Sequence, residues 1–471
     1  MSSITLWIKR SSVISAAPVI EFALRFARTA ILSRLLVPGE FGTAVAISVV
    51  LSTAALVTDV ALEKFVMVSP EKNRALAPAH MLSVMRGAVL AVVLFAGAPS
   101  AAALFGVPQF AGSFAFGGII VLVESFAHLS IKQAQRDYDY GREALAQLLS
   151  NLTGFVAVIP AVYVFADHRA ILASFVVGSG VYAVSSHVLA RTPYRLRSDW
   201  AMFRAALLFG VPLTLNGLGL AIIAQLDRAM VGHWFGVDVL ATYAVILSIS
   251  VLPVSLIHRV FGTMGLSFLI SKKTEALVRA EYYSALVFVF AILATAYTLF
   301  IVLTLDVLTP IVFGPAFSVE PGVHVMIAAI VFLRLQMGGA PTNLLLATGR
   351  TRQLALLNLS SGFGLVCAIG FVQLWGGFES LLFGLLIGDI IRFPLFYLIS
   401  SRATTLGGPP ILLDLAIAIL VSTVIAGMLA WSPEFMWTTR AIIFTVGAIA
   451  IGMQLAYGFH RHSALRGLLL K

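Results

Sequence analysis

Long apolar runs separated by short polar connectors repeat along this 471-residue chain. Fourteen of the runs are about 20 residues long, which is the length that an α-helix needs to cross the hydrocarbon core of a bilayer. Their centres lie near residues 25, 51, 92, 121, 157, 178, 214, 249, 291, 329, 366, 388, 418 and 447. Pro, Gly or charged residues mark the connectors, as at 37–39 and 407–410. The pattern predicts an all-α polytopic membrane protein with about 14 transmembrane helices.

Composition supports a membrane protein and argues against a soluble enzyme. Sixty per cent of the residues are hydrophobic and 11% are charged, whereas soluble domains carry about 25% charged residues. The connectors are too short to hold a soluble catalytic domain, and no Walker-type phosphate loop is present. The single cysteine, Cys367, excludes a disulfide framework. We therefore expect a protein that is not an enzyme and that uses no cofactor and no metal.

The distribution of basic residues predicts how the chain crosses the membrane. With a cytoplasmic N-terminus, most of the 31 Lys and Arg residues fall in cytoplasmic connectors or termini, and the opposite connectors clearly contain only Arg169 and Arg440. Basic residues are enriched on the cytoplasmic side of membrane proteins. Both termini are therefore predicted to be cytoplasmic. Topology, rather than binding of nucleic acid, explains the net charge of +10.

Three charged residues, Glu21, Arg25 and Arg28, lie in the middle of the first apolar run. On a helix their side chains fall within about 60° of one another. A charge at the bilayer centre costs at least about 2.5–3.5 kcal/mol, so this stripe has to face protein or water. Arginine stays ionised and binds phosphate bidentately, which makes the stripe a candidate substrate site. The alternative is that Glu21 and Arg25, four residues apart, only neutralise each other.

Arg334 is a further candidate for substrate binding, because it lies in the tenth run without an acidic residue within one helical turn. Either it lines a substrate cavity, or it forms a salt bridge with an acid in the other half of the protein. Asp389 and Arg392 are three residues apart in the twelfth run and are predicted to pair with each other.

Three residues are candidates for binding a proton or another coupling ion. Glu124 and His128 are one helical turn apart in the fourth run, and a buried carboxylate beside an imidazole can exchange protons near neutral pH. Asp59 in the second run is a similar candidate. The alternatives are helix–helix hydrogen bonding for the first two and a place near the cytoplasmic surface for Asp59.

The seventh run carries features of a gate or hinge. Pro212 and Asn216 lie in a Gly-rich stretch that weakens a helix locally and suits a bending element. Asp227 and Arg228 are predicted to mark the outer end of the same helix. Close helix packing explains the small residues equally well.

An internal repeat relates the two halves of the chain. Segment 28–47, RTAILSRLLVPGEFGTAVAI, is weakly repeated in segment 228–246, RAMVGHWFGVDVLATYAVI, and residues 41–44 align with residues 240–243. Both copies join an odd run to an even one, and six runs separate them, so the halves have the same orientation. The predicted division is an N-terminal six-helix lobe, a C-terminal six-helix lobe and an accessory helix pair, at residues 1–198, 199–403 and 404–471.

Three segments resemble bacterial polysaccharide flippases of the Wzx type. Segment 28–47 is similar to the Arg/Leu/Gly/Phe-Gly signature that opens those proteins. Segment 131–154, IKQAQRDYDYGREALAQLLSNLTG, resembles the part after their fourth helix, and segment 209–236, FGVPLTLNGLGLAIIAQLDRAMVGHWFG, resembles their seventh helix. The chain departs from the family at Asp238, a position that is often small or polar.

The resemblance implies a member of the multidrug/oligosaccharidyl-lipid/polysaccharide exporter superfamily in the bacterial cytoplasmic (inner) membrane. Such proteins enclose a central cavity between two lobes and flip a polyprenyl-pyrophosphate-linked oligosaccharide outward by alternating access. The implied partners are this substrate, membrane lipids and a polysaccharide polymerase or export machinery, and a coupling ion would be H⁺ or Na⁺. The alternatives are a cation-coupled multidrug antiporter of the same superfamily and a membrane polysaccharide polymerase or acyltransferase.

Overall fold

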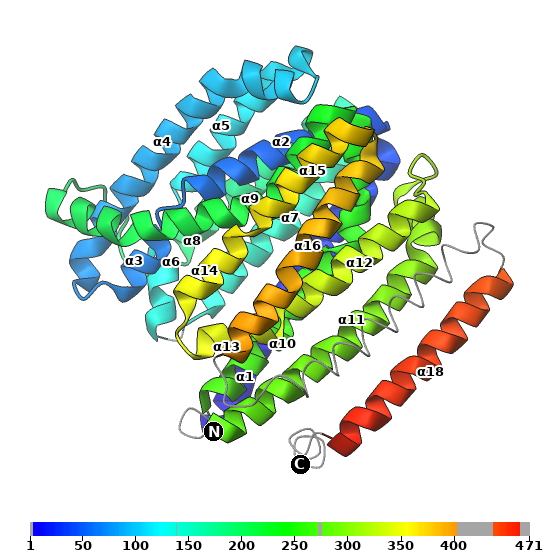
Figure 1. Ribbon diagram of the computed structural model, residues 1–471. Helices are drawn as coiled ribbons and strands as arrows, with labels where there is room; N and C mark the ends of the chain where they lie inside the picture. The colour runs from blue at the N-terminus through cyan, green and yellow to red at the C-terminus, as the bar shows by residue number, and fades with distance from the viewer. Residues whose placement is uncertain (1–2, 138, 272–275, 403–436, 462–471) are drawn as a thin grey trace. The chain divides into compact units, whose positions relative to one another are not determined.

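The computed structural model describes residues 3–137, 139–271, 276–402 and 437–461, and these residues form helices and connectors without a β-strand (Figure 1). The chain forms two compact units, Met1–Val245 and Ile246–Lys471. The helices of the first unit are α1 (Ser3–Leu35), α2 (Pro38–Val57), α3 (Leu62–Val68), α4 (Lys72–Leu104), α5 (Ala111–Ser125), α6 (Ser130–Gln133), α7 (Gly141–Phe165), α8 (Arg169–Val188) and most of α9 (Trp200–Ser250). Those of the second are α10 (Leu252–Ser271), α11 (Ala276–Phe313), α12 (Pro321–Gly338), α13 (Ala340–Ala347), α14 (Thr351–Leu359), α15 (Ser361–Trp375), α16 (Phe378–Ser401) and α18 (Trp437–Arg461).

Within the described residues, ten helical segments are long and apolar enough to cross a membrane. They coincide with ten of the fourteen predicted runs. The runs centred near residues 25, 214 and 447 are also helical, in α1, α9 and α18. The run near residue 418 lies outside the described residues. The prediction of an all-α polytopic membrane protein is confirmed, whereas the division into lobes at residues 198 and 403 stays a prediction.

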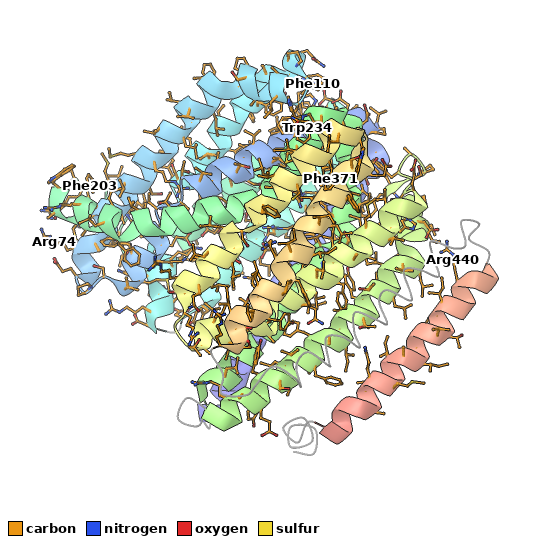
Figure 2. All side chains as sticks on the ribbon, viewed as in Figure 1. Arg74, Phe110, Phe203, Trp234, Phe371 and Arg440 are labelled. Atoms are coloured by element: carbon orange, nitrogen blue, oxygen red, sulfur yellow. The ribbon has the colours of Figure 1, made fainter. Side chains whose placement is uncertain are left out.

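The first unit is built from antiparallel helix pairs. Helix α4 packs along α5 and α7 along α8, while α1 lies against α7. Small residues let these backbones approach closely, as membrane helices commonly do. A Cβ atom on Gly154 of α7 would lie 3.1 Å from the Ser174 carbonyl oxygen of α8. Figure 2 shows Arg74 and Phe203 toward one end of this unit, and Phe110 and Trp234 toward the other.

Helix α9 is two helical segments joined at a sharp turn. Gly236 interrupts the helix with φ 82° and ψ 173°, a backbone conformation that glycine adopts without strain. The Tyr243 hydroxyl donates a 2.8 Å hydrogen bond to Oδ2 of Asp227. In one straight helix these residues would be about 24 Å apart, so the chain folds back at Gly236. The turn therefore separates the seventh and eighth predicted helices.

The second unit also depends on close helix contacts. Helices α15 and α16 pack so tightly that a Cβ atom on Gly388 would lie 2.1 Å from the Cα atom of Gly364. Helix α12 packs against both α11 and α16. Helix α18 lies along α11, where Arg440 forms an ion pair with Asp306 and donates a 2.7 Å hydrogen bond to the Leu303 carbonyl.

Candidate functional site

The charged stripe of the first predicted span lies on α1. Oε1 of Glu21 is 2.6 Å from Nη2 of Arg25, so these two residues form the ion pair that their spacing allows. The Arg25 side chain is nevertheless 54% exposed, and that of Glu21 is 23% exposed. The pair thus leaves much of the Arg25 guanidinium accessible to a further ligand.

Arg28, one turn further along α1, contacts neutral groups of α8. Its Nη1 donates a 3.4 Å hydrogen bond to the Ser174 hydroxyl, and its guanidinium carbon lies 5.0 Å from the centre of the Phe175 ring. The Ser174 hydroxyl donates its own hydrogen to the Gly154 carbonyl at 2.7 Å, which leaves its oxygen free to accept from Arg28. Among the described residues, no carboxylate lies within ion-pair distance of Arg28. The stripe therefore holds two arginines and one glutamate at membrane depth.

The second unit has a separate cluster in which two arginines share one aspartate. Nε of Arg334 on α12 is 2.9 Å from Oδ2 of Asp389 on α16, and Nη1 of Arg392 is 2.7 Å from Oδ1. The expected Asp389–Arg392 pair is thus present. The acid that Arg334 finds lies in the same unit, so this ion pair does not join the two halves. Arg392 is also bonded to the Ser360 hydroxyl at 3.2 Å, whereas the Arg334 side chain is 25% exposed.

Asp59 lies in the turn between α2 and α3 rather than inside a helix, because α2 ends at Val57. Its Oδ1 accepts a 2.8 Å hydrogen bond from the Ala61 backbone, which has a left-handed conformation with φ 50°. The same oxygen is 3.8 Å from Nη1 of Arg86. The Asp59 side chain is half exposed and is accessible to a cation.

Glu124 and His128 do not share a helix as expected, because α5 ends at Ser125. The Glu124 side chain is exposed, whereas His128 is buried. Nδ1 of His128 accepts a 3.2 Å hydrogen bond from the Ser130 backbone, and Nε2 is 2.9 Å from the Thr192 carbonyl. This pattern requires the neutral imidazole with its proton on Nε2, and burial lowers the pKa of His128. Its geometry is that of a residue that fixes the α8–α9 connector.

The predicted gate residues of the seventh run all lie on α9. Asp227 is buried, and its second oxygen accepts a 2.7 Å hydrogen bond from the Arg228 backbone. Arg228 donates to the Gln225 side chain at 3.4 Å. The helix continues beyond these residues to Gly236, so they do not mark its end. Pro212 and Asn216 have helical backbones, but their side chains lie outside what the structure describes.

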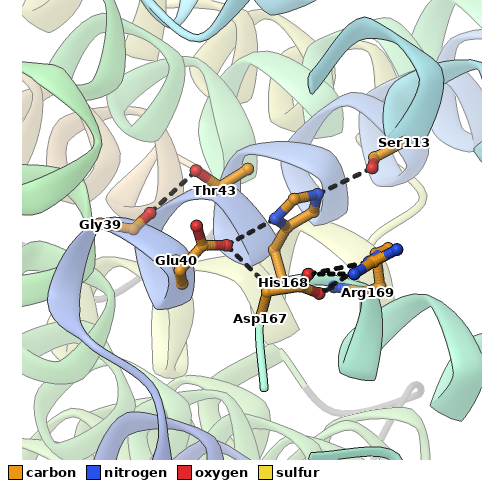
Figure 3. A network of polar contacts seen from close by, with 7 residues as sticks. All are labelled: Gly39, Glu40, Thr43, Ser113, Asp167, His168 and Arg169. Carbon is orange, nitrogen blue, oxygen red and sulfur yellow. Dashed lines mark hydrogen bonds and ion pairs between the residues drawn. The ribbon is translucent and has the colours of Figure 1, made fainter. Parts of the chain in front are cut away.

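Sequence reasoning missed a polar network that joins three connectors (Figure 3). Oε2 of Glu40 accepts a 3.0 Å hydrogen bond from the His168 backbone and is 2.6 Å from Nδ1 of the same residue. Nε2 of His168 is 2.7 Å from the Ser113 hydroxyl. Glu40 and Ser113 lie in the first turns of α2 and α5, and His168 directly precedes α8. The predicted topology places all three connectors on one side of the membrane, which is the signal that could have suggested the network.

A second missed network lies at the opposite end of the first unit. Nζ of Lys132 is 2.9 Å from Oε2 of Glu63 and 2.5 Å from Oε1 of Glu143. Burial alone lowers the pKa of Lys132, but the charges of these two carboxylates outweigh it and raise the pKa above its ordinary value. The Tyr182 hydroxyl also donates to Glu143, at 3.3 Å. The network ties α3, α7 and α8 to the short helix α6.

Three solved structures share the fold. The lipid II flippase MurJ in an inward closed conformation matches with a TM-score of 0.72 and 13% identity, over 96% of this chain and 99% of that chain. An inward-facing multidrug resistance MATE family transporter of the MOP superfamily matches with a TM-score of 0.62 and 14% identity, over 84% and 98%. A MATE transporter of Vibrio cholerae matches with a TM-score of 0.54 and 14% identity, over 84% and 95%. At such identities the likeness concerns the fold.

The sequence itself matches one family over more than half of its length. No curated protein matches the chain. Residues 31–320 match the family described as polysaccharide biosynthesis protein, and this range contains the α8 partners of Arg28, the whole Glu40–His168–Ser113 network and the α9 turn. The chain is therefore a multi-pass membrane protein that belongs to the polysaccharide biosynthesis protein family and has the fold of MOP superfamily transporters.

Proposed function

We propose that this protein moves a polyprenyl-pyrophosphate-linked oligosaccharide repeat unit from the cytoplasmic to the outer leaflet of the bacterial cytoplasmic membrane by alternating access. The cargo would serve the export of an exopolysaccharide, a capsule or an O-antigen. Membership of the polysaccharide biosynthesis protein family supports the carbohydrate part of this cargo. The fold shared with a lipid II flippase supports the lipid part.

The observation that carries the proposal is the surroundings of Arg28. A guanidinium at membrane depth is costly unless an anion or water accompanies it, and the partners of Arg28 are a hydroxyl and an aromatic ring. A pyrophosphate supplies the missing negative charge and accepts bidentate hydrogen bonds from arginine. The accessible face of Arg25 lies one turn away on the same helix, and Glu21 orients that residue.

Arg334 would provide a second contact for the cargo. Its side chain is the more exposed of the two arginines that share Asp389, so it can turn to an anion while Arg392 keeps the carboxylate. For a coupling ion, either H⁺ or Na⁺, the exposed carboxylates of Asp59 and Glu124 are the better candidates. His128 has both ring nitrogens engaged with backbone groups, so its contribution would be to position the connector.

The fold shared with multidrug MATE transporters makes a drug antiporter the second candidate. The composition of the stripe disfavours it, because two arginines and one glutamate repel the cationic compounds that such an antiporter would carry. The phenotype of a strain that lacks the gene distinguishes the flippase from the drug antiporter. Unchanged surface polysaccharide together with altered drug sensitivity would support the antiporter.

The direct test is complementation of that strain with point variants. Loss of the gene should cause lipid-linked oligosaccharide to accumulate on the cytoplasmic side, and wild-type protein should restore surface polysaccharide. Removing a charge-assisted bidentate contact costs about 1.5–3 kcal/mol, which corresponds to a loss of about 10- to 150-fold. Arg28→Ala should therefore fail to restore export, and Arg28→Lys should restore it partly because lysine keeps the charge without the bidentate geometry.

The matched control is Arg34→Ala, an exposed arginine at the end of the same helix. This variant should restore export fully at equal expression. If Arg28→Ala restored export to the wild-type level, Arg28 would not be a contact for the pyrophosphate. Absence of any lipid-linked intermediate in the deletion strain would refute the proposed function itself.

A further inference from the structure

The connector between α8 and α9 carries three arginines whose charges the protein leaves unbalanced. Arg191, Arg195 and Arg197 are exposed, and within the residues that the structure describes no carboxylate lies within ion-pair distance of any of them. The connector lies at the end of the first unit where Arg74 and Phe203 are found (Figure 2). Other basic side chains at this end are neutralised by acids: Arg74 pairs with Asp199, Lys132 with Glu63 and Glu143, and Arg142 with Asp139.

The backbone of this connector is held in place by two histidines. Nδ1 of His80 on α4 is 3.3 Å from the Arg195 carbonyl, and Nε2 of His128 is 2.9 Å from the Thr192 carbonyl. The Tyr194 ring packs on His80, with 4.4 Å between the ring centroids. The stretch between the first and the third arginine is therefore fixed before a ligand arrives. A fixed backbone lowers the entropy that is lost on binding.

An apolar groove between α7 and α8 ends beside the same connector. It has a volume of about 470 Å³, and its walls include Leu145 of α7 and Val184 and Val188 of α8. Ser185 is the one residue with a polar side chain that lines the groove, and its hydroxyl donates a 2.6 Å hydrogen bond to the Val181 carbonyl. The groove therefore offers a ligand apolar contacts and no free hydrogen-bond donor, which suits a hydrocarbon chain.

The length and position of the groove match one leaflet of a bilayer. Its lining residues on α8 run from Gly180 to Leu189, which is about 14 Å along a helix. The hydrocarbon core of a bilayer is about 30 Å thick, so one leaflet contributes about half of that. Leu189 is two residues before Arg191, and its carbonyl accepts a 3.4 Å hydrogen bond from Arg142. The polar end of a chain in the groove would therefore lie next to the connector.

From this arrangement we infer that Arg191, Arg195 and Arg197 bind the phosphate of an anionic phospholipid of the cytoplasmic leaflet, with one acyl chain in the α7–α8 groove. Guanidinium groups bind phosphate through charge-assisted hydrogen bonds, and basic clusters beside membrane spans recognise anionic lipids. Trp200, at the start of α9, is 77% exposed, as is typical of a residue at the level of the headgroups. The groove favours a phospholipid over the cargo, because a polyprenyl chain is much longer than one leaflet is thick.

The test is lipid retention by the full-length protein in detergent, measured by native mass spectrometry. The probes are phosphatidylglycerol and a phosphatidylcholine with the same acyl chains, and the wild type should retain the first in preference to the second. Each arginine beside an anionic headgroup strengthens binding about fivefold, so the triple exchange should weaken phosphatidylglycerol binding on the order of 100-fold. That variant carries Arg191→Gln, Arg195→Gln and Arg197→Gln. The matched control removes the same charge from predicted cytoplasmic connectors of the second unit and should bind as the wild type does; it carries Arg350→Gln, Arg352→Gln and Arg402→Gln.

Gly180→Leu tests the groove separately. No heavy atom lies within 4 Å of a Cβ atom at Gly180, so the fold accepts a leucine there, and its side chain occupies the groove. Each methylene of the acyl chain that the leucine displaces should weaken phospholipid binding about fourfold. Gly97→Leu on α4 is the control, because Gly97 is equally open and lies outside the groove. Without added lipid, the unfolding midpoints of both variants should stay at the wild-type value.

Three results would overturn the inference. The first is equal retention of the two phospholipids by the wild type, and the second is an equal loss of phosphatidylglycerol in the triple variant and its second-unit control. The third is a triple variant that binds undecaprenyl phosphate more weakly but phosphatidylglycerol as before, because the arginines would then gather the cargo. Lipid retention is measured without transport, so the inference stands or falls separately from the complementation result that decides the proposed function.

Discussion

Replacing Asp389 with asparagine should destabilise the second unit strongly. The carboxylate is 4% exposed and accepts from Arg334 at 2.9 Å and from Arg392 at 2.7 Å. Removing the anion leaves two guanidinium groups close together at membrane depth, and breaking a buried ion pair costs about 3–5 kcal/mol. For a domain of roughly 200 residues, each kcal/mol lowers the unfolding midpoint by about 2–4 °C. We expect Asp389→Asn to lower the midpoint by about 6–20 °C in detergent.

The ranking of neighbouring variants makes this prediction specific. Arg334→Met removes the more exposed arginine and leaves the Asp389–Arg392 pair intact, so it should cost about 1 kcal/mol or less. Adding Arg392→Met to Asp389→Asn should recover part of the loss, because it removes a charge that has lost its partner. The midpoints are measured by intrinsic fluorescence and by the loss of the monodisperse peak on size exclusion.

The outcome also separates structure from transport at this cluster. Arg334→Met should reduce transport while keeping stability near that of the wild type, if Arg334 contacts the cargo. The measurement has to be precise enough to detect a loss of about 1 kcal/mol. If the midpoint of Asp389→Asn then lies within about 2 °C of the wild-type midpoint, the reasoning is refuted. Equal losses for Asp389→Asn and Arg334→Met would refute the assignment of Arg392 as the structural arginine.

Three further predictions concern the first unit. Lys132→Met should cost about 3 kcal/mol at pH 8, because Glu63 and Glu143 lose their shared cation. Because the pKa of Lys132 is raised above its ordinary value, its side chain stays charged throughout the range below about 10, so the deficit should be the same at about pH 7 and about pH 9; a clearly smaller deficit at the higher pH would contradict this. The pKa of His128 is lowered by burial, so the unfolded chain takes up a proton first as the pH falls below about 6.5 and stability declines. His128→Leu should show a smaller fall in midpoint between pH 7.5 and pH 5.5, and an unchanged fall would place the acid sensitivity elsewhere. Tyr243→Phe should cost about 1–3 kcal/mol, because it removes a buried hydrogen bond across the α9 turn; a midpoint equal to that of the wild type would show that the turn holds without it.

The helices were predictable because membrane spans are long and uniformly apolar. Pairs that lie one turn apart on a helix were predictable for a similar reason, as Glu21–Arg25 and Asp389–Arg392 illustrate. Helix spacing alone determines whether such side chains can meet. The polytopic fold and these local ion pairs therefore follow from the pattern of the chain.

Contacts between distant elements were not predictable in this way. Arg334 meets an aspartate 55 residues away, and Glu40 meets a histidine 128 residues away. Whether two such distant side chains face each other depends on how their helices pack, and a single sequence does not reveal this packing. The end of α5 at Ser125 was also missed, because the apolar run continues beyond it and only the tertiary contacts of His128 require the helix to stop.

The fold-back of α9 at Gly236 has a consequence for how the protein is made. The two helical segments are joined without a polar loop, and the hydrogen bond between Asp227 and Tyr243 lies across the turn. A ribosome-bound chain that released the first segment alone into lipid would expose the Asp227 carboxylate without its partner. The pair is therefore expected to leave the translocon together as one hairpin, and a mutation of Tyr243 should slow membrane insertion as well as weaken the finished fold.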